Sequence, residues 1–318
     1  MRKVVLLYNP VSGGSGMRRL AELESALVAL RAAGVEAQVI PCHSRSDAAE
    51  QARNAVNSGC DTVFACGGDG TIHDVVQILA NSAVALAILP MGTANSLAHD
   101  LKLPFDLTAA ARAALQATPR RIALGRIEYL DLENHPVARY FIVAAGAGVD
   151  AYVFHSLNPA TKQRLGMMAY YAKAWNLWFS HVMIRFLAEY VEGSESNTSP
   201  TSANVTQLLS VRIRNFGGVL QELAPGASLD RDDLRLVYCR TSSRIAYLAY
   251  VLRGLLRQKW KIPGIDLAYC KKVSCRYLPQ ASKPQPTVYV EADGELLGTL
   301  PAEITIVPDA LTLLVPSE

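Results

Sequence analysis

Apolar and polar positions follow two different patterns along this chain. In the early part, uninterrupted apolar runs alternate with amphipathic stretches of helical period. Such runs are typical of strands that are buried on both faces of a parallel sheet. They span residues 4–8, 35–40, 62–65 and 85–89. The stretches between them predict helices, one with Leu20, Leu23, Leu27 and Leu30 on a shared face. This order predicts an α/β N-terminal domain.

After a predicted helix at 107–117, the pattern changes to partial alternation, which predicts strands separated by turns. The expected strands span residues 122–132, 140–145, 208–214, 234–239, 273–277, 287–291 and 303–307. Two helical stretches, 162–190 and 243–261, interrupt them, and the segment 193–204, rich in serine and threonine, is expected to be a loop. The second part is therefore predicted to be a mostly antiparallel domain with helical insertions.

Composition narrows the class of protein. The chain has 318 residues, enough for two domains, and 50% are hydrophobic, but no run of about 18 uncharged apolar residues predicts a membrane-spanning helix. The apolar run at 4–8 is too short for a signal sequence. The six cysteines lack CxxC spacing, so we expect reduced, buried thiols in a cytoplasmic protein. A net charge of +3 gives no indication of nucleic-acid binding.

The sequence Gly67-Gly68-Asp69-Gly70-Thr71 joins a predicted strand to a predicted helix. Strand, glycine turn and helix in this order bring backbone N–H groups up to a phosphate. Thr71 is expected to cap the helix. Asp69 suits a site where a divalent cation or a transferable proton accompanies the phosphate. The alternative is an ordinary tight turn in which Asp69 is a local cap.

Four patches, in order along the chain, together resemble the diacylglycerol kinase catalytic family in its soluble bacterial lipid-kinase form, which is related to sphingosine kinases. They are Asn9-Pro10-Val11-Ser12-Gly13, the glycine turn at 67–71, Pro90-Met91-Gly92-Thr93-Ala94-Asn95 and Asp293-Gly294-Glu295. Residues 146–151 and 215–218 also resemble the second domain of that family. The resemblance extends over nearly the whole chain.

The resemblance implies a nucleotide-binding α/β domain at 1–122, to which residues 308–318 return. A β-sandwich domain for the lipid acceptor is implied at 123–307, with the active site in the cleft between the two. The implied reaction is transfer of the ATP γ-phosphate, with Mg²⁺, to the hydroxyl of a diacylglycerol or a sphingoid-like lipid.

The resemblance also assigns site residues by position. Asp69 falls on the central acid, Glu295 on the general base, and Asp293 is its catalytic neighbour. The ATP-binding positions are Asn9, Pro10, Val11, Ser12, Gly13, Ser44, Gly67, Gly68, Gly70, Thr71, Ile72, His73, Gly92, Thr93 and Asn95. A structural magnesium site is implied at the Asp232 side chain and the carbonyls of Leu229 and Leu234. Considered alone, Asp293-Gly294 is also a common hairpin turn.

Several positions depart from the family pattern: Ser96 and Ala123 stand where acids are usual, Val143 where an asparagine is common, Cys42 near a nucleotide-contacting threonine, and Asp233 where the metal site has a glycine. Asp69 then carries most of the negative charge alone, or a second acid comes from a residue such as Asp74 or Asp100.

Two stretches suggest access to lipid. Residues 166–191 are rich in aromatic residues and could line an acyl-chain tunnel, while 245–262 combines leucines with Arg253, Arg257, Lys259 and Lys261. A basic amphipathic helix suits an anionic membrane surface, so we expect a cytoplasmic protein that visits the membrane. Alternatively, both helices only close the second domain. A homodimer is left open.

Two other functions compete with a lipid kinase. NAD kinases share the glycine turn, and loss of the acids at positions 96 and 123 would suit a non-catalytic protein that binds lipid or nucleotide. The hydrophobic helices and the Asp293-Gly294-Glu295 triplet favour a lipid acceptor.

Overall fold

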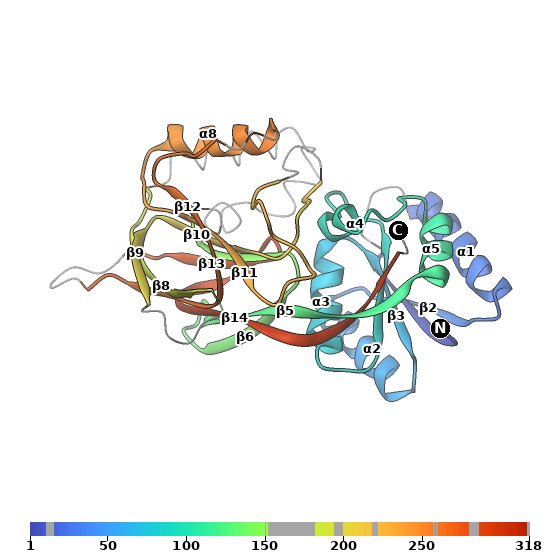
Figure 1. Ribbon diagram of the computed structural model, residues 1–318. Helices are drawn as coiled ribbons and strands as arrows, with labels where there is room; N and C mark the ends of the chain where they lie inside the picture. Colours follow the sequence, from blue (N-terminus) through green and yellow to red (C-terminus); the bar gives the residue numbers. More distant parts are fainter. Residues whose placement is uncertain are drawn as a thin grey trace. The chain divides into compact units, whose positions relative to one another are not determined.

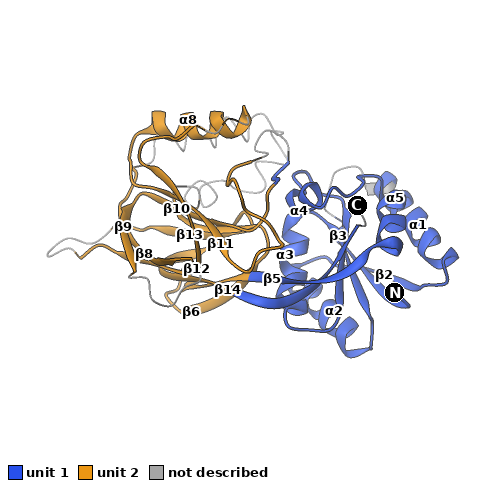
Figure 2. Cartoon of the chain, viewed as in Figure 1, with its two compact units in different colours: residues 1–124, 215–221, 307–318 blue, residues 125–214, 222–306 orange. Residues whose placement is uncertain are grey.

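A computed structural model describes residues 1–10, 16–149, 151, 182–193, 200–217, 222–256, 258, 260–279 and 286–316. The chain divides into two compact units (Figures 1 and 2). Unit 1 comprises Met1–Leu124, Asn215–Gln221 and Val307–Glu318, and unit 2 comprises Gly125–Arg214 and Glu222–Ile306.

Unit 1 is built on a parallel sheet. Its strands are β2 (Glu36–Pro41), β1 (Lys3–Tyr8), β3 (Thr62–Gly67), β4 (Ala85–Pro90) and the end of β14 (Glu295–Val315), in that spatial order. Every residue of β3 and β4 is buried, which accounts for their uninterrupted apolar runs. The last strand joins through the pairs Thr312 with Ala85 and Leu313 with Leu86.

Helices connect the strands of unit 1. They are α1 (Gly16–Ala32), α2 (Arg45–Asn57), α3 (Asp69–Leu79), α4 (Ser96–Asp100) and α5 (Leu107–Gln116). Leu23 and Leu30 of α1 and Leu107 of α5 belong to the core cluster that covers one face of the sheet. The predicted leucine face of α1 is therefore buried, although Leu20 at its start is 45% exposed.

Unit 2 consists mainly of antiparallel strands. One run of neighbouring strands is β13 (Tyr289–Ala292), β7 (Ala144–Gly148), β10 (Gln207–Val211), β11 (Leu234–Cys239) and β12 (Ile265–Tyr277). A second run joins β9 (Thr201–Val205) and β8 (Phe186–Glu192) through β12 and β14 to β5 (Thr118–Leu130) and β6 (Pro136–Phe141).

The strands β12 and β14 belong to both runs, since β14 also pairs with β13. Side chains from both runs, such as Leu236, Phe186 and Ile304, form one buried core. An α/β N-terminal part and a β-rich C-terminal part confirm the predicted fold class.

Some predicted elements are wrong. Strand β8 overlaps the end of the stretch predicted as a helix at 162–190 and continues to Glu192. Phe186, Ala188 and Tyr190 are buried at alternate positions, which is the period of a strand. Strand β9 overlaps the end of the predicted loop at 193–204 and pairs with β8. The rest of the aromatic stretch, from 166 to 181, lies outside the described residues, and so does the predicted acyl-chain tunnel.

Helix α8 (Arg244–Leu255) begins where the sequence predicts a helix, with the Ser243 side chain accepting a hydrogen bond from Ala246 N, but it ends at Leu255, before the predicted end at residue 261. Within the described part of the chain, no helix is both long and apolar enough to cross a bilayer.

Candidate active site

The ends of three neighbouring parallel strands bring the predicted nucleotide-binding segments together in unit 1. Asn9 follows β1, Gly67 ends β3 and Met91 follows β4. Asn9 N donates to Cys66 O at 3.2 Å, and Met91 N donates to Gly67 O at 2.9 Å. The carboxyl edge of a parallel sheet is where α/β folds bind ligands, so these contacts place the candidate site at that edge.

The glycine turn starts helix α3. Gly68 is its N-cap and has no side chain with which to accept a hydrogen bond from the first-turn amides. A phosphate oxygen is the acceptor that such a helix start binds well. Thr71 does not cap the helix as predicted: it lies within the first turn, is 7% exposed and packs against Gly67.

The glycine turn and the loop after β4 approach each other at their backbones. A Cβ atom added to Gly92 would lie 2.4 Å from Gly68 Cα, and one added to Gly68 would lie 3.1 Å from Gly92 Cα. Only glycine at both positions allows this approach without a shift of backbone atoms. The two loops therefore form one surface.

Asp69 and Asn95 fix the two loops. Asp69 Oδ1 accepts a hydrogen bond from Ser96 N at 2.8 Å, which links the glycine turn to the start of α4. Asn95 has a left-handed backbone with φ of 50°. Its side chain accepts from Gly92 N at 2.9 Å and donates to Gly92 O at 2.8 Å. Asn95 thus braces the loop from inside, while the neighbouring Thr93 is exposed.

The remaining predicted ATP-binding residues differ in access. The Ser44 hydroxyl caps α2 by accepting from Asp47 N at 3.1 Å. Ile72 and His73 are 2% and 1% exposed, so their side chains belong to the interior. Val11, Ser12 and Gly13 lie outside the described residues, whereas Asn9 and Pro10 are partly exposed at the end of β1.

Acidic residues near the glycine turn, Asp69, Asp74 and Asp100, are the candidate ligands for a cation. No three metal-ligating side chains come together among the described residues. Asp100 Oδ1 accepts from Asn215 N at 2.8 Å, and Asp74 Oδ2 lies 4.0 Å from Arg45 Nε. The sequence suggested either of these residues as a second acid beside Asp69. Mg²⁺ is commonly held by one or two carboxylates together with substrate phosphates, which fits a site with Asp69 and a phosphate-binding turn.

Glu295 lies in unit 2 at the first position of β14. A two-residue turn, Asp293-Gly294, joins β13 to β14, with φ of 49° and 80°. Both values are positive, as in the hairpin turns that Asp-Gly favours. Glu295 pairs with Ala292 across the turn and is half-buried.

Asp293 has a structural contact set. Its carboxylate accepts from the amides of Ile142, Val143 and Ala144 at 3.1, 2.9 and 3.1 Å, and its own N–H donates to Ala144 O at 2.8 Å. The turn is thereby fixed to the start of β7. A further acid at this turn, Glu291, is 3% exposed, and its Oε2 accepts from Gly294 N at 3.1 Å. Its place in an apolar strand pattern gave no signal.

The predicted structural metal loop surrounds a buried arginine. Arg212 is 0% exposed, and its Nη1 donates to Arg231 O and Asp233 O, both at 2.6 Å. Burial lowers the pKa of Arg212 to about 10, while Asp233, Asp232 and Asp230 oppose that shift. The guanidinium is therefore charged at neutral pH.

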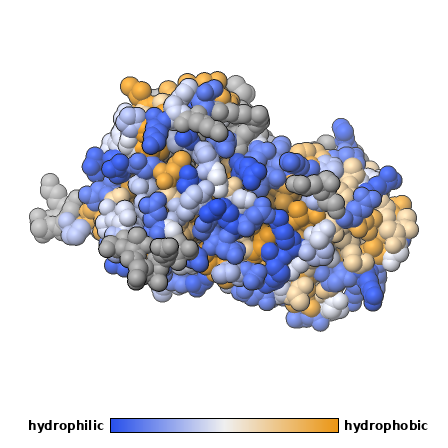
Figure 3. All heavy atoms as spheres, in the orientation of Figure 1, coloured by the Kyte–Doolittle hydropathy of each residue, from blue (hydrophilic) through white to orange (hydrophobic). Residues whose placement is uncertain are grey.

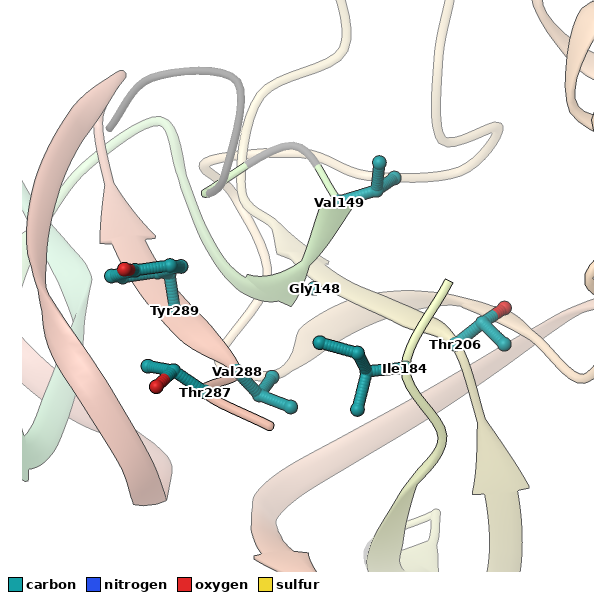
Figure 4. A pocket seen from close by; sticks show the side chains of 7 residues that line it. All are labelled: Gly148, Val149, Ile184, Thr206, Thr287, Val288 and Tyr289. Atoms are coloured by element: carbon teal, nitrogen blue, oxygen red, sulfur yellow. The ribbon is translucent and has the colours of Figure 1, made fainter. Parts of the chain in front are cut away.

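Unit 2 has a small cavity of about 10 Å³ (Figure 4). It is lined by Gly148, Val149, Ile184, Thr206, Thr287, Val288 and Tyr289. A cavity of this volume holds about one water molecule, so it has no room for an acyl chain.

Comparisons with known proteins agree with this geometry. The family model of the diacylglycerol kinase catalytic domain matches residues 3–127. A diacylglycerol kinase of Staphylococcus aureus (strain bovine RF122 / ET3-1) is 25% identical over 324 residues, covering 100% of this chain and 93% of that protein.

Two solved structures share the fold. A diacylglycerol kinase of Bacillus anthracis str. Sterne superposes with a TM-score of 0.74 at 18% identity, covering 99% of this chain and 97% of that one. Yeast NADH kinase complexed with NADH superposes with a TM-score of 0.57 at 11% identity, covering 100% and 84%. At these identities the likeness concerns the fold alone.

Proposed function

Since this chain belongs to the diacylglycerol kinase catalytic-domain family of lipid kinases, we propose that it transfers the γ-phosphate of ATP to a lipid hydroxyl. The observation that carries the proposal is the surface formed by the Gly68 turn and the Gly92 loop. There, a helix start without a side-chain cap and two closely approaching glycines leave backbone N–H groups to bind phosphate.

Asp69 is proposed to supply the negative charge at the phosphates. Its Oδ1 is held by the Ser96 amide, so the carboxylate has a fixed direction before any ligand arrives. Phosphoryl transfer depends mainly on positioning and charge neutralisation, and a fixed acid serves both. Bound Mg²⁺ would neutralise charge on the phosphates, with Asp69 as its protein ligand.

Glu295 is proposed as the general base that accepts the proton of the lipid hydroxyl. A base has to stand at a defined position, within hydrogen-bond reach of the attacking oxygen. A defined position for Glu295 is supported by the Asp293-Gly294 turn, where three amides hold the Asp293 carboxylate. We accordingly assign Asp293 as a positioning residue, and Glu295 alone as the base in this unit.

The acceptor is a lipid, so we also propose that the protein docks on a membrane through helix α8. The helix exposes a row of apolar side chains: Ile245, Leu248, Val251, Leu252, Leu255 and Leu256, with exposed fractions from 37% to 79%. Figure 3 shows hydrophobic residues over α8 at the top of the view. Trp260, 46% exposed, follows the helix, and Lys261 is exposed beside it.

The expected cationic face of this helix needs correction. Arg253 is 6% exposed, and its guanidinium carbon lies 4.2 Å from the centre of the Tyr250 ring as a cation–π pair. Arg257 and Lys259 lie outside the described residues. Docking by α8 would thus rest on insertion of its apolar face more than on basic residues.

One assay tests the proposed reaction. The protein is incubated with radiolabelled ATP, Mg²⁺ and either NAD or vesicles that contain diacylglycerol or a sphingoid base. We expect label in the lipid fraction only. Label on NAD would overturn the proposal in favour of a NAD kinase, and ATP binding without any labelled acceptor would favour a non-catalytic binding protein.

Glu295→Gln is the matched variant for this assay, because glutamine keeps the size of the side chain but cannot take up the proton. We expect the maximal rate to fall roughly a hundredfold or more with nearly unchanged ATP affinity. A near-normal rate would remove Glu295 from the mechanism.

A further inference from the structure

The loop that precedes β11 is organised around a cation that belongs to the protein. Arg212 follows strand β10 directly, and its side chain is fully buried. One nitrogen, Nη1, donates to two carbonyls of the loop, Arg231 O and Asp233 O, both at 2.6 Å. Short hydrogen bonds from a charged donor are among the stronger ones in proteins.

Two further arginines hold the same loop from outside. Arg231 and Arg235 each place their guanidinium carbon 4.1 Å from the centre of the Tyr269 ring. Arg235 Nε donates to Pro225 O at 2.8 Å, and Tyr269 Oη donates to Gly226 O at 3.1 Å. Arg231 also pairs with Asp233, Nε to Oδ1 at 2.7 Å. Asp233 is therefore engaged within the loop.

This arrangement does not fit a divalent cation at the implied site of Asp232, Leu229 and Leu234. Asp232 is the single carboxylate of that set and is exposed, and the other two ligands would be neutral main-chain carbonyls. A buried guanidinium already bonds the carbonyls of Arg231 and Asp233 in the same short loop, so a divalent cation in this loop would be repelled by a like charge.

We propose that Arg212 is the resident cation of the 228–234 loop, and that this loop keeps its conformation without a bound metal ion. The guanidinium performs the structural task of a metal, since it bonds backbone carbonyls from the interior of the unit. The three aspartates at 230, 232 and 233 favour its charged form.

The wild-type protein gives the direct test. It is dialysed against EDTA, and its metal content and its thermal unfolding are measured with and without Mg²⁺ or Ca²⁺ in the absence of nucleotide. We expect less than about 0.1 equivalent of divalent metal and a Tm that stays within about 1 °C in all buffers. Retention of about one equivalent of divalent metal after dialysis would overturn the proposal. The same holds if EDTA lowers the Tm of the wild type and the Asp232→Asn substitution lowers it by an equal amount.

Arg212→Met tests the role of the guanidinium, because methionine fills much of the space but cannot donate. Loss of two charged hydrogen bonds to buried carbonyls should lower Tm by roughly 5–10 °C. Arg235→Met is the matched control: it removes a guanidinium from the same loop at a partly exposed position, and we expect a clearly smaller shift. An unchanged Tm for Arg212→Met would contradict the proposal. If this variant fails to fold, the wild-type measurements decide, and they do not depend on kinase activity.

Discussion

Asp69 and Asp293 show how the hydrogen bonds of a carboxylate distinguish two roles. Asp69 Oδ1 accepts a hydrogen bond from Ser96 N at the surface formed by the Gly68 turn and the Gly92 loop in unit 1. Asp293 accepts from three consecutive amides in unit 2. Both acids lie beside glycines in turn-forming sequences, Asp69 in the Gly67–Thr71 turn and Asp293 in the Asp293-Gly294 turn. A carboxylate that accepts hydrogen bonds from three amides is nevertheless poorly placed to exchange protons or ligands. We therefore expect the two residues to respond differently to substitution.

Asp69→Asn separates the charge of the side chain from its structural contact. Asparagine retains an oxygen that can accept from Ser96 N, so the loop connection and the Tm should persist. Loss of the charge should lower kcat/KM roughly a hundredfold and weaken Mg²⁺-dependent ATP binding. Kinetics and ATP titrations with and without Mg²⁺ measure this. Equal ATP affinity of variant and wild type in Mg²⁺ would exclude Asp69 from the cation site.

Asp293→Asn should act on stability. The variant keeps one acceptor oxygen but loses the charge that strengthens three hydrogen bonds, so the free energy of unfolding should fall by about 2 kcal/mol. Asp309→Asn is a matched control, because Asp309 has the same φ of 49° and is exposed. It should change stability by less than about 0.5 kcal/mol. Denaturant unfolding compares the two variants, and equal effects would contradict a stabilising role of the Asp293 carboxylate.

At the scale of elements, helix α8 has an unusual distribution of side chains. Its buried face carries Tyr247, Tyr250 and Arg253, whereas its leucines face solvent. Tyr250 Oη donates to Leu223 O at 2.6 Å, and the Tyr247 hydroxyl lies 2.8 Å from Thr206 Oγ1. The hydroxyl groups of these tyrosines thus attach the helix to loop residues of unit 2, and its apolar side remains exposed.

The double variant Leu248→Gln/Leu252→Gln should lower partitioning onto lipid vesicles roughly tenfold, because two exposed leucines no longer enter the apolar layer. Raised salt should leave most of the wild-type binding intact. Leu20→Gln/Val28→Gln on α1 is the control, with similarly exposed apolar residues on another helix. Vesicle sedimentation measures all three proteins. Binding that the control lowers as much as the α8 variant would exclude α8 as the docking surface.

Elements with a single strong pattern were predictable from the sequence. Strands β1, β3 and β4 are almost entirely buried, so their apolar runs and the loops after them could be placed directly. Strand β8 could not, because its aromatic residues continue a helical-looking stretch and only the pairing with β12 and β9 reveals its period.

The site was predictable as a set of segments, but the roles of individual side chains were not. Ser44 and Asn95 use their side chains for a cap and a brace, and His73 points into the core. Arg212 gave no signal, since a lone arginine after a strand is ordinarily exposed. These roles depend on contacts between residues far apart in the chain, which local patterns do not contain.

At the scale of the whole molecule, all six cysteines are buried and none forms a disulfide. Burial raises the pKa of Cys42 to about 11 and that of Cys270 and Cys275 to about 12, so thiolate is scarce at pH 8. We expect a thiol reagent such as DTNB to modify less than about one cysteine per native chain, and six after denaturation. Rapid modification of several thiols in the native protein would contradict this.

Strand β14 makes the N-terminal unit depend on residues near the other end of the given sequence. It begins at Glu295 in unit 2, and its end supplies the strand beside β4 in unit 1. The region that matches the kinase family, 3–127, therefore lacks one strand of its own sheet. During translation, this region leaves the ribosome before the end of β14 has been synthesised. Until then, the edge of β4 has unpaired N–H and C=O groups. Unit 1 can complete its sheet only after residues 312–313 have been synthesised and have paired with β4. A truncation that removes the end of β14 would therefore destabilise unit 1.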